Sequence, residues 1–247
     1  MALGLIGTGM IGGTLARLAV AAGLDVVLSN SRGPATLADL VSELGDRARA
    51  ATPAEAAQAG DLVVATIPLG VHTQLPADAL SGRTVIDTMN YYPQRDGQIP
   101  ELDSNELTSS QLVQRHLAGS RVVKAFNNIS FFSLGTLARP TGAADRSALP
   151  IAGDDPTAKA QVAELLNTLG YDAVDIGSLA DSWRSEPETP VYVQPYMPGQ
   201  PPEGLSQEEA FRWLLETPGN TVPASRIKEL TESAVRGRAG GRFPAAE

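Results

Sequence analysis

Three glycines near the start of the chain have the spacing of a nucleotide-binding turn. Gly7, Gly9 and Gly12 follow the apolar run Leu3–Ile6, which predicts a buried strand, and helical periodicity follows them. In a dinucleotide site the first glycine allows a tight turn, the second lets the backbone approach the pyrophosphate, and the third allows close helix–strand packing. The alternative is a glycine-rich turn that binds nothing. We predict that a dinucleotide contacts the whole turn: Gly7, Thr8, Gly9, Met10, Ile11 and Gly12.

The end of the second predicted strand favours NADP(H) over NAD(H). An NAD site usually places a carboxylate about 20 residues beyond the glycines, where it binds the ribose 2′-hydroxyl. Here that position holds Ser29–Arg32, which contains no carboxylate, and Asp25 lies at the opposite end of the strand. A guanidinium pairs well with a phosphate, so we predict that Arg32 binds the 2′-phosphate and that Ser31 adds a hydroxyl. The alternative for Arg32 is a solvated loop arginine.

Alternating strand and helix signals in the first half predict an α/β fold, a Rossmann-type doubly wound parallel sheet. We assign residues 1–147 to this dinucleotide-binding domain. The loop between residues 90 and 103 is long and aromatic. Ligands of such sheets bind at the carboxyl ends of the strands. The expected strands are Leu3–Ile6, Asp25–Asn30, Arg47–Ala51, Asp61–Ile67, Thr84–Thr88 and Arg121–Phe126, and the expected helices are Pro34–Leu44, one from Pro53, Thr73–Leu80 and Ser109–Leu117.

Two further units follow. Residues 148–185 predict a small C-terminal α/β unit, and residues 186–247 predict an arm followed by terminal helices. Six prolines between positions 187 and 202 exclude a helix or a central strand there. The expected elements are the strands Leu149–Ala152 and Tyr171–Ile176 and the helices Pro156–Leu169, Ser178–Trp183, Ser206–Glu216 and Pro223–Arg236.

We predict structural roles for two charged residues, Asp155 and Lys124. Asp155 precedes Pro156, so it is well placed to cap the following helix. Lys124 lies in a predicted strand, where an edge lysine that extends its ammonium to water is the ordinary case.

The residues that follow the other strands are candidates for the chemistry. Hydride transfer between two rings depends on stacking geometry, whereas a carbonyl or imine acceptor more often needs a positioned acid. Histidine and asparagine side chains could face the nicotinamide, and aromatic side chains could line the acceptor pocket; each could equally be a loop or packing residue. We predict catalytic roles for His72 and Asn127, further cofactor contacts from Ile67, Pro68, His72 and Asn127, and an acceptor pocket of Tyr91, Tyr92, Asn128 and Trp183.

Composition excludes several classes of function. With 19 basic and 28 acidic residues the net charge is −9, which argues against nucleic acid or an anionic membrane as partner. There is no cysteine, and the two histidines, His72 and His116, are far apart, so we expect no metal site. No leader and no apolar run of the ~18 residues of a membrane span are evident, so we expect a cytoplasmic protein. Aromatic residues in the proline-rich arm favour a homodimer.

Several short motifs occur in the order found in the NADPH-dependent deazaflavin reductases, the coenzyme F420:NADP oxidoreductases. The chain is also similar to the oxidoreductase domains of STEAP metalloreductases. The resemblance covers about residues 2–185, whereas the loop at 90–103 and everything from Pro187 onward depart from it. The motifs are Gly7–Gly12, Ser31-Arg32, Thr66–Pro68, Val123–Asn127, Gly153–Asp155 and Asp175–Gly177.

The resemblance implies that Thr8, Ser31 and Arg32 hold the 2′-phosphate, that a deazaflavin or flavin stacks on the nicotinamide, and that the protein is a dimer. It favours an NADP-dependent oxidoreductase that transfers hydride between NADP(H) and a deazaflavin, coenzyme F420. Two alternatives stay open. One is a reductase of another acceptor, such as a flavin, quinone, imine or small carbonyl compound. The other is a non-enzymatic protein that senses NADP(H).

Overall fold

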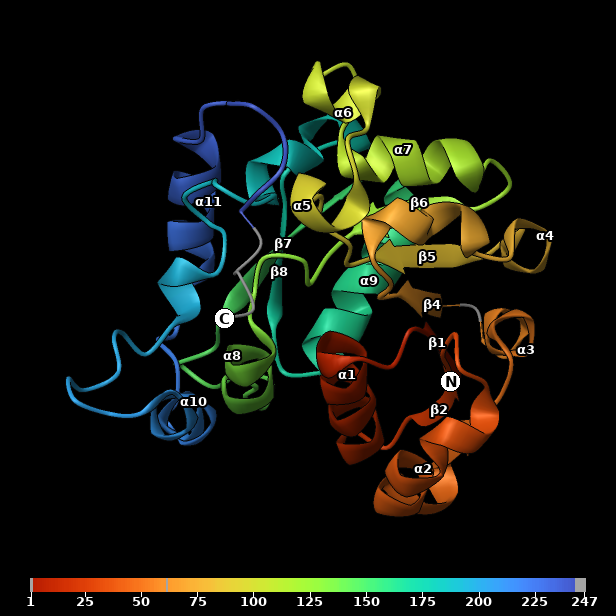
Figure 1. Ribbon diagram of the computed structural model, residues 1–247, viewed down its shortest axis with the longest axis horizontal. Helices are drawn as coiled ribbons and strands as arrows, with labels where there is room; N and C mark the ends of the chain where they lie inside the picture. Colours follow the sequence, from red (N-terminus) through yellow and green to blue (C-terminus); the bar gives the residue numbers. More distant parts are fainter. Residues whose placement is uncertain (1, 61, 243–247) are drawn as a thin grey trace.

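The computed structural model describes residues 2–60 and 62–242, and its centre is one eight-stranded sheet (Figure 1). The strand order is β3-β2-β1-β4-β5-β6-β7-β8. The first six strands are parallel and follow the 3-2-1-4-5-6 order of dinucleotide-binding sheets, which confirms the predicted fold class. The strands are Ala2–Ile6 (β1), Asp25–Ser29 (β2), Ala48–Ala50 (β3), Leu62–Ala65 (β4), Thr84–Asp87 (β5), Arg121–Lys124 (β6), Ala148–Gly153 (β7) and Asp172–Asp175 (β8).

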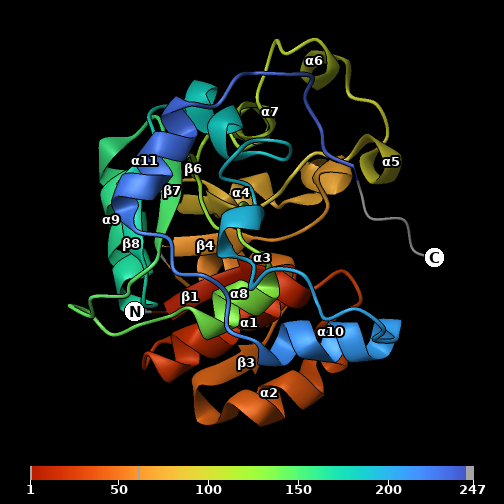
Figure 2. The same ribbon diagram turned by 90° about the vertical axis from the view of Figure 1, so that its left-hand side faces the viewer.

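Helices cover both faces of this sheet (Figures 1 and 2). Among the residues described, no helix has the length and apolar character needed to cross a bilayer. The α-helices are Met10–Ala21 (α1), Ala38–Leu44 (α2), Pro53–Gln58 (α3), Ala77–Leu80 (α4), Pro93–Asp96 (α5), Pro100–Asp103 (α6), Ser109–His116 (α7), Phe131–Thr136 (α8), Pro156–Thr168 (α9), Gln207–Glu216 (α10) and Ala224–Glu232 (α11). The 3₁₀ segments are Pro34–Leu37, Gly45–Arg47, Leu69–Gln74, Leu179–Ser185 and Gln194–Tyr196.

The core has one apolar layer on each face of the sheet. Strands β4 and β5 are buried along their whole length, as expected of central parallel strands. Buried residues of α1, α8, α9 and α11 pack on one face, and those of α3, α4 and α7 pack on the other. The helices therefore hold the strands rigidly, so that the loops at the carboxyl ends of β1, β4, β5 and β6 meet at one edge.

The predicted C-terminal α/β unit continues the same sheet. Strand β7 pairs with β6 in the antiparallel direction, and β8 pairs with β7 in the parallel direction. Asp155 caps α9 as predicted, since its carboxylate accepts from the backbone N–H of Ala158 at 2.7 Å. The unit thereby places α9 and α11 against the sheet beside the dinucleotide-binding half.

Several predicted elements differ from the structure. The long loop at 90–103 contains α5 and α6, each four residues long and begun by a proline, too short to show helical periodicity. Helix α8 was not among the predicted elements. The helix expected at 178–183 is the 3₁₀ segment Leu179–Ser185, and the one expected at 73–80 splits around Pro76 into a 3₁₀ segment and α4. The strand expected from Asp61 starts at Leu62 within the described residues.

The proline-rich segment, residues 187–202, packs against the body as an extended arm. Its Val191 and Tyr196 are buried in the core, and the Tyr196 hydroxyl donates to the Ala148 carbonyl at 2.9 Å. The backbone N–H of Gly241 donates to the Tyr91 carbonyl at 3.0 Å, so the chain returns beside the same edge of the sheet. The arm thus forms part of the wall at the carboxyl ends of the strands.

Candidate functional site

The glycine turn has the geometry that a dinucleotide requires. Gly7 has φ 98°, which other residues rarely adopt, and its N–H donates to the Ser29 carbonyl at 2.9 Å. A Cβ at Gly12 would overlap the carbonyl oxygen of Gly7 and lie 2.8 Å from Thr66 Oγ1. A Cβ at Gly9 would meet nothing within 4 Å. The first and third glycines therefore serve packing, and the second leaves open space for a ligand.

Helix α1 presents its N-terminus to this open space. Its N-cap is Gly9, which supplies no capping side chain, and its first turn carries no acidic residue. The first backbone N–H groups of the helix therefore have no side-chain acceptor at the cap, and the helix dipole adds a partial positive charge. These are the conditions under which a helix N-terminus binds a phosphate.

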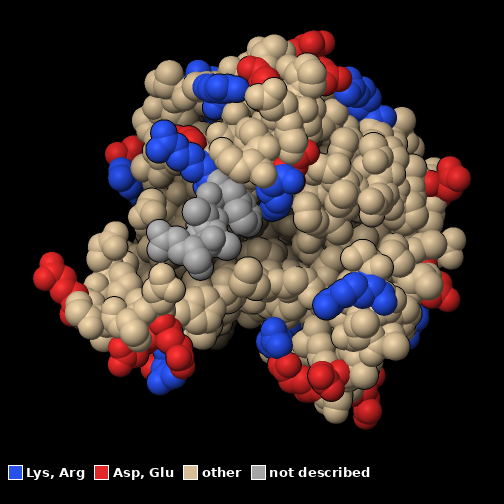
Figure 3. Space-filling view, in the orientation of Figure 1, with Lys and Arg blue, Asp and Glu red and all other residues tan. Residues whose placement is uncertain are grey.

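A cleft of about 600 Å³ opens beside the glycine turn. Figure 3 shows this face of the molecule hollowed between its upper and lower parts, with basic side chains above and below the hollow. The walls come from the loops after β1, β4, β5 and β6 and from the arm. Its lining residues are Gly9–Gly12, Thr66–Pro68, Thr88–Asn90, Tyr92, Arg95, Phe126, Asn127, Ile129–Phe131, Tyr192 and Val193.

The loop after β2 is shaped by Asn30 and leaves Arg32 exposed. The Asn30 carbonyl oxygen Oδ1 accepts from the Arg32 N–H at 2.9 Å, and its amide nitrogen donates to Thr36 Oγ1 at 2.9 Å. Within residues 2–60 and 62–242, the Arg32 guanidinium makes no hydrogen bond or ion pair with another side chain. Ser31 is exposed beside it. The Thr8 hydroxyl differs, because it donates to the Ser29 carbonyl at 2.7 Å and ties the glycine turn to β2.

Of the predicted residues after β4, the structure brings Ile67 and Pro68 to the cleft but not His72. His72 lies in the 3₁₀ segment Leu69–Gln74, where its Nδ1 is 2.9 Å from the Leu69 carbonyl. Its ring packs edge-on against the ring of His116, with 5.9 Å between the two ring centroids. Since the 3₁₀ segment carries the ring away from the cleft, the predicted catalytic and cofactor roles of His72 are not supported.

Three residues of the predicted acceptor pocket are structural. Tyr91 is buried and bonds to Asp103 at 3.0 Å, outside the cleft. Asn128 is fully buried, and its amide donates to the Val191 carbonyl and the Tyr196 hydroxyl, each at 3.1 Å. Trp183 packs beneath the guanidinium of Arg184, 4.6 Å from its ring centroid, away from the cleft. Of that predicted pocket, only Tyr92 lines the cleft.

Asn127 lines the cleft, but its amide group already has partners. Its Nδ2 donates to the Ser185 carbonyl at 2.7 Å and to Asn90 Oδ1 at 3.1 Å, and its Oδ1 accepts from the Ser185 hydroxyl at 3.3 Å. These bonds join the loop after β6 to the loop after β5 and to the 3₁₀ segment Leu179–Ser185, directly before the arm. Asn127 therefore holds the cleft wall together, and its predicted catalytic role stays a prediction.

A polar cluster lies at one corner of an otherwise largely apolar cleft. The hydroxyls of Tyr92 and Tyr192 are hydrogen-bonded to each other, and Asn90 Nδ2 is 3.4 Å from the Tyr192 hydroxyl. Arg95 stacks over the Tyr92 ring, 5.0 Å from its centroid. Burial raises the pKa of both Tyr92 and Tyr192, so both phenols are neutral at physiological pH.

Sequence reasoning missed Tyr192, which lies about one hundred residues from its partner Tyr92. The only signal was the apolar and aromatic character of a proline-rich stretch, which argued against disorder without indicating where the stretch would pack.

The environment of Lys124 also differs from the prediction of an edge lysine that reaches water. This side chain is 1% exposed, and its ammonium contacts Asp87 Oδ2 at 3.4 Å, Ser109 Oγ at 2.9 Å and the Met89 carbonyl.

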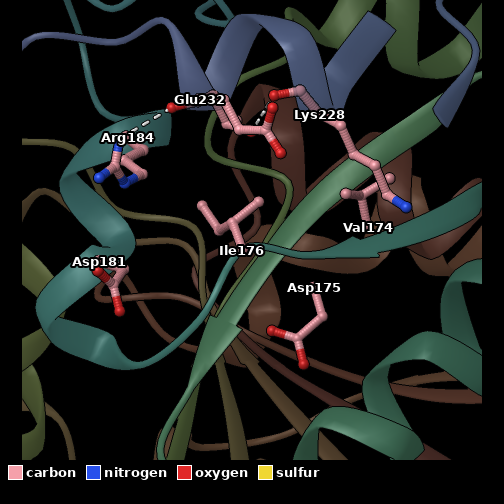
Figure 4. A pocket seen from close by; sticks show the side chains of 8 residues that line it. Val174, Asp175, Ile176, Asp181, Arg184, Lys228 and Glu232 are labelled. Carbon is pink, nitrogen blue, oxygen red and sulfur yellow. Dashed lines mark hydrogen bonds between the residues drawn. The ribbon is translucent and has the colours of Figure 1, made fainter. Parts of the chain in front are cut away.

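A second hollow lies between β8, the 3₁₀ segment before the arm, and α11 (Figure 4). Its charged side chains are largely engaged in structural bonds. Asp175 pairs with Lys159 at 2.7 Å, Asp181 accepts from the Ser178 hydroxyl at 2.7 Å, and Arg184 donates to the Thr231 carbonyl at 3.0 Å. The cleft beside the glycine turn, which has free helix N–H groups, is therefore the better candidate.

Two comparisons relate the chain to curated sequence families. Residues 2–91 match the family described as NADP oxidoreductase, coenzyme F420-dependent. Rat metalloreductase STEAP3 is 29% identical over 182 residues, which form 73% of this chain and 34% of the rat protein. The chain spans less than two-fifths of the curated relatives that it matches, 39% and 34% of their lengths.

Solved structures extend the likeness beyond the glycine turn. The protein SMa0349 from Sinorhizobium meliloti superimposes with a TM-score of 0.68 at 29% identity, covering 78% of this chain and 92% of that one. A candidate F420-dependent NADP reductase from Arthrobacter sp. FB24 gives 0.61 at 25% identity, covering 73% and 86%. The resemblance read from the motifs is thereby confirmed: residues 2–91 match the coenzyme F420-dependent NADP oxidoreductase family, and the chain is similar to the STEAP3 metalloreductase.

Proposed function

We propose that this protein is an NADP-dependent oxidoreductase that transfers hydride between NADP(H) and a planar ring acceptor of the deazaflavin class. The observation that carries the proposal is the cleft at the carboxyl ends of β1, β4, β5 and β6. It joins a phosphate-binding helix N-terminus to an apolar space large enough for a ring. When bound, the nicotinamide supplies or accepts the hydride, and the chain supplies position and surroundings.

The residues present fit the dinucleotide. The open space at Gly9 and the N–H groups at the start of α1 suit the pyrophosphate, and the exposed Arg32 and Ser31 suit a 2′-phosphate. The Thr8 hydroxyl would have to release the Ser29 carbonyl to donate there. Apolar side chains of Ile67, Pro68 and other lining residues exclude water from the space where the rings would stack.

The acceptor class follows from the character of the cleft. An imine or small carbonyl acceptor usually takes a proton from a positioned acid. The described residues that line the cleft include no histidine, lysine or carboxylate, and burial raises the pKa of both lining tyrosines, which makes them weaker acids. A deazaflavin or flavin can take its accompanying proton from solvent, so ring-to-ring hydride transfer makes the smaller demand on this site.

The cofactor choice gives a first prediction. Arg32→Ala is expected to weaken NADPH binding by about 1.5–3 kcal/mol, the worth of a hydrogen bond to a charged group, and to leave NADH binding nearly unchanged. Nicotinamide fluorescence titrations with both cofactors measure the difference. Arg47→Ala is the matched control, because Arg47 pairs with Asp25 at the opposite end of β2. Equal losses for NADPH and NADH in Arg32→Ala would remove Arg32 from the phosphate site.

The reaction is tested with the purified protein, NADPH and a panel of oxidised acceptors: a deazaflavin, FMN, FAD, a quinone and simple imines. Absorbance at the nicotinamide band follows turnover. Efficient reduction of the deazaflavin, with slow or no reduction of imines, is the expected result. Turnover of an imine or carbonyl compound alone would move the protein to the other reductase class. Tight NADPH binding without turnover of any acceptor would favour the sensing protein.

A further inference from the structure

We propose that Tyr192, together with Asn90 and Tyr92, hydrogen-bonds the imide edge of the acceptor ring and so determines acceptor specificity. This inference rests on the proposed function and names the acceptor group that the cleft recognises. A flavin and a deazaflavin share this edge, in which an N–H lies between two carbonyl groups.

The arm fixes Tyr192 in the wall of the cleft through buried bonds. The N–H of the next residue, Val193, donates to the Asn128 carbonyl at 2.8 Å, and the Asn128 amide donates back to the Val191 carbonyl at 3.1 Å. Three residues further along, Tyr196 is fully buried. A bond on each side of Tyr192 therefore holds its backbone to the end of β6.

The backbone at this point is strained. Val193 has φ 57° and ψ −56°, and the N–H of Gln194 donates to the Tyr192 carbonyl at 2.6 Å, which closes a tight three-residue turn. A β-branched residue rarely adopts a positive φ, and strained residues of this kind concentrate at ligand-binding sites. The strain is tolerated because the flanking bonds to Asn128 overdetermine the turn, and its result is to place both Tyr192 and Val193 in the cleft wall.

The tyrosine cluster suits a ligand edge that both donates and accepts. A phenol hydroxyl has one donor and two acceptor positions. Tyr192 uses two of them, toward Tyr92 and Asn90, and so retains one for a ligand in the cleft. If Tyr192 donates to Tyr92 the remaining position accepts, and if it accepts from Tyr92 the remaining position donates. Rotation of two hydrogens therefore matches either the N–H or a carbonyl of an imide.

The rest of the cleft distinguishes a ring from a small molecule. The lining of the cleft outside the cluster is largely apolar and includes Met89, Ile129 and Phe131. An apolar pocket with a few convergent polar groups fixes the orientation of a flat ligand through one polar edge. The hydride-accepting atom of a flavin-type ring lies in the central ring, next to the ring that carries the imide, so this orientation places it further from Tyr192 than the imide edge is.

The test measures binding of two flavin rings, lumiflavin and its N3-methyl derivative, to the protein–NADP⁺ complex by quenching of ring fluorescence. Wild type is expected to bind the N3-methyl ring about tenfold more weakly, because the methyl group blocks the imide N–H. Tyr192→Phe is expected to bind lumiflavin about three- to tenfold more weakly, as the loss of one hydrogen bond predicts, and to discriminate less between the two rings. Its affinity for NADPH should equal that of wild type.

Tyr171→Phe is the control, because its buried hydroxyl donates to the Leu134 carbonyl at 2.7 Å outside the cleft. Equal affinity of Tyr192→Phe and wild type for lumiflavin, or equal affinity of wild type for the two rings, overturns the inference. So does the absence of ring binding by wild type. Ring binding with the expected discrimination but no reduction by NADPH supports the inference and refutes the proposed function, so the two failures are distinguishable.

Discussion

A Gly12→Ala variant is expected to lose both folding stability and nucleotide binding. Its Cβ would overlap the Gly7 carbonyl oxygen and lie 2.8 Å from Thr66 Oγ1. Both neighbours are fixed, Gly7 by its bond to Ser29 and Thr66 by its N–H bond to the Ile6 carbonyl at 2.8 Å. Helix α1 must therefore shift away from β1, which we expect to cost about 3 kcal/mol in the free energy of unfolding, the upper part of the range for overpacking.

A Gly9→Ala variant separates the two effects. Gly9 has φ −84°, which alanine adopts without strain, and the added methyl group would meet no protein atom within 4 Å. We expect unfolding stability close to wild type. The same methyl group would occupy the space in which a pyrophosphate reaches the N–H groups of α1. We expect NADPH affinity to fall by about 1.5–3 kcal/mol for each hydrogen bond to phosphate that is lost.

Urea unfolding and NADPH fluorescence titration of both variants provide the measurement. Gly135→Ala is the control, since its methyl group on α8 would make an ordinary 3.6 Å contact with Thr14 of α1 and should stabilise the helix by up to ~1 kcal/mol. Unchanged NADPH affinity in Gly9→Ala would mean that no phosphate binds at the start of α1. A stable Gly12→Ala would mean that helix and strand are less closely packed than the structure shows.

The contrast between these glycines shows why part of the site was predictable. The turn is local, because it consists of one strand, six residues and one helix that follow one another in the chain. The spacing of its glycines is enough to predict which of them packs and which faces the ligand. The fold class followed from the same logic, because alternating strands and helices allow few topologies. The loop after β2 was predictable for the same reason, since Arg32 follows directly from the end of its strand. Each of these predictions needed no contact between distant segments.

The acceptor side of the site depends on such distant contacts. Tyr92 meets Tyr192 one hundred residues later in the chain, and Asn127 meets Ser185. Asparagines and tyrosines after a strand do not reveal whether an arm will bury them or leave them in the cleft. His72 lies outside the cleft for a related reason, because its ring in the 3₁₀ segment after β4 packs against His116. The position of a residue after a strand therefore makes it a candidate for the site, but the path of the connecting segment decides whether its side chain reaches the cleft.

Replacement of Lys124 by methionine is expected to destabilise the protein by about 3–5 kcal/mol, as loss of one partner of a buried ion pair does. The Lys124 ammonium lies 3.4 Å from Asp87 Oδ2, and both side chains are almost completely buried. Ser109 links it to a second carboxylate, because the Ser109 hydroxyl accepts from Lys124 and donates to Glu186 at 2.7 Å. Methionine fills a similar volume but leaves both buried carboxylates without their cation.

The double variant Lys124→Met with Asp87→Asn tests this explanation. It removes one of the two stranded charges, so it should be about 1–2 kcal/mol more stable than Lys124→Met alone, within the usual cost of one buried group left without its partner. Arg17→Met is the control for an exposed pair. Arg17 bonds Glu43 at 2.6 Å with both side chains half exposed, so its loss should cost less than ~1 kcal/mol.

Urea unfolding of the four proteins, followed by circular dichroism, measures these differences. A Lys124→Met protein no less stable than Arg17→Met would show that the buried charges are not held by Lys124. The network also connects Met89, in the cleft wall, to Glu186, at the start of the arm. At a temperature where Lys124→Met remains folded, we therefore expect faster proteolysis of residues 187–202 than in wild type, because the arm loses one of its anchors to the sheet.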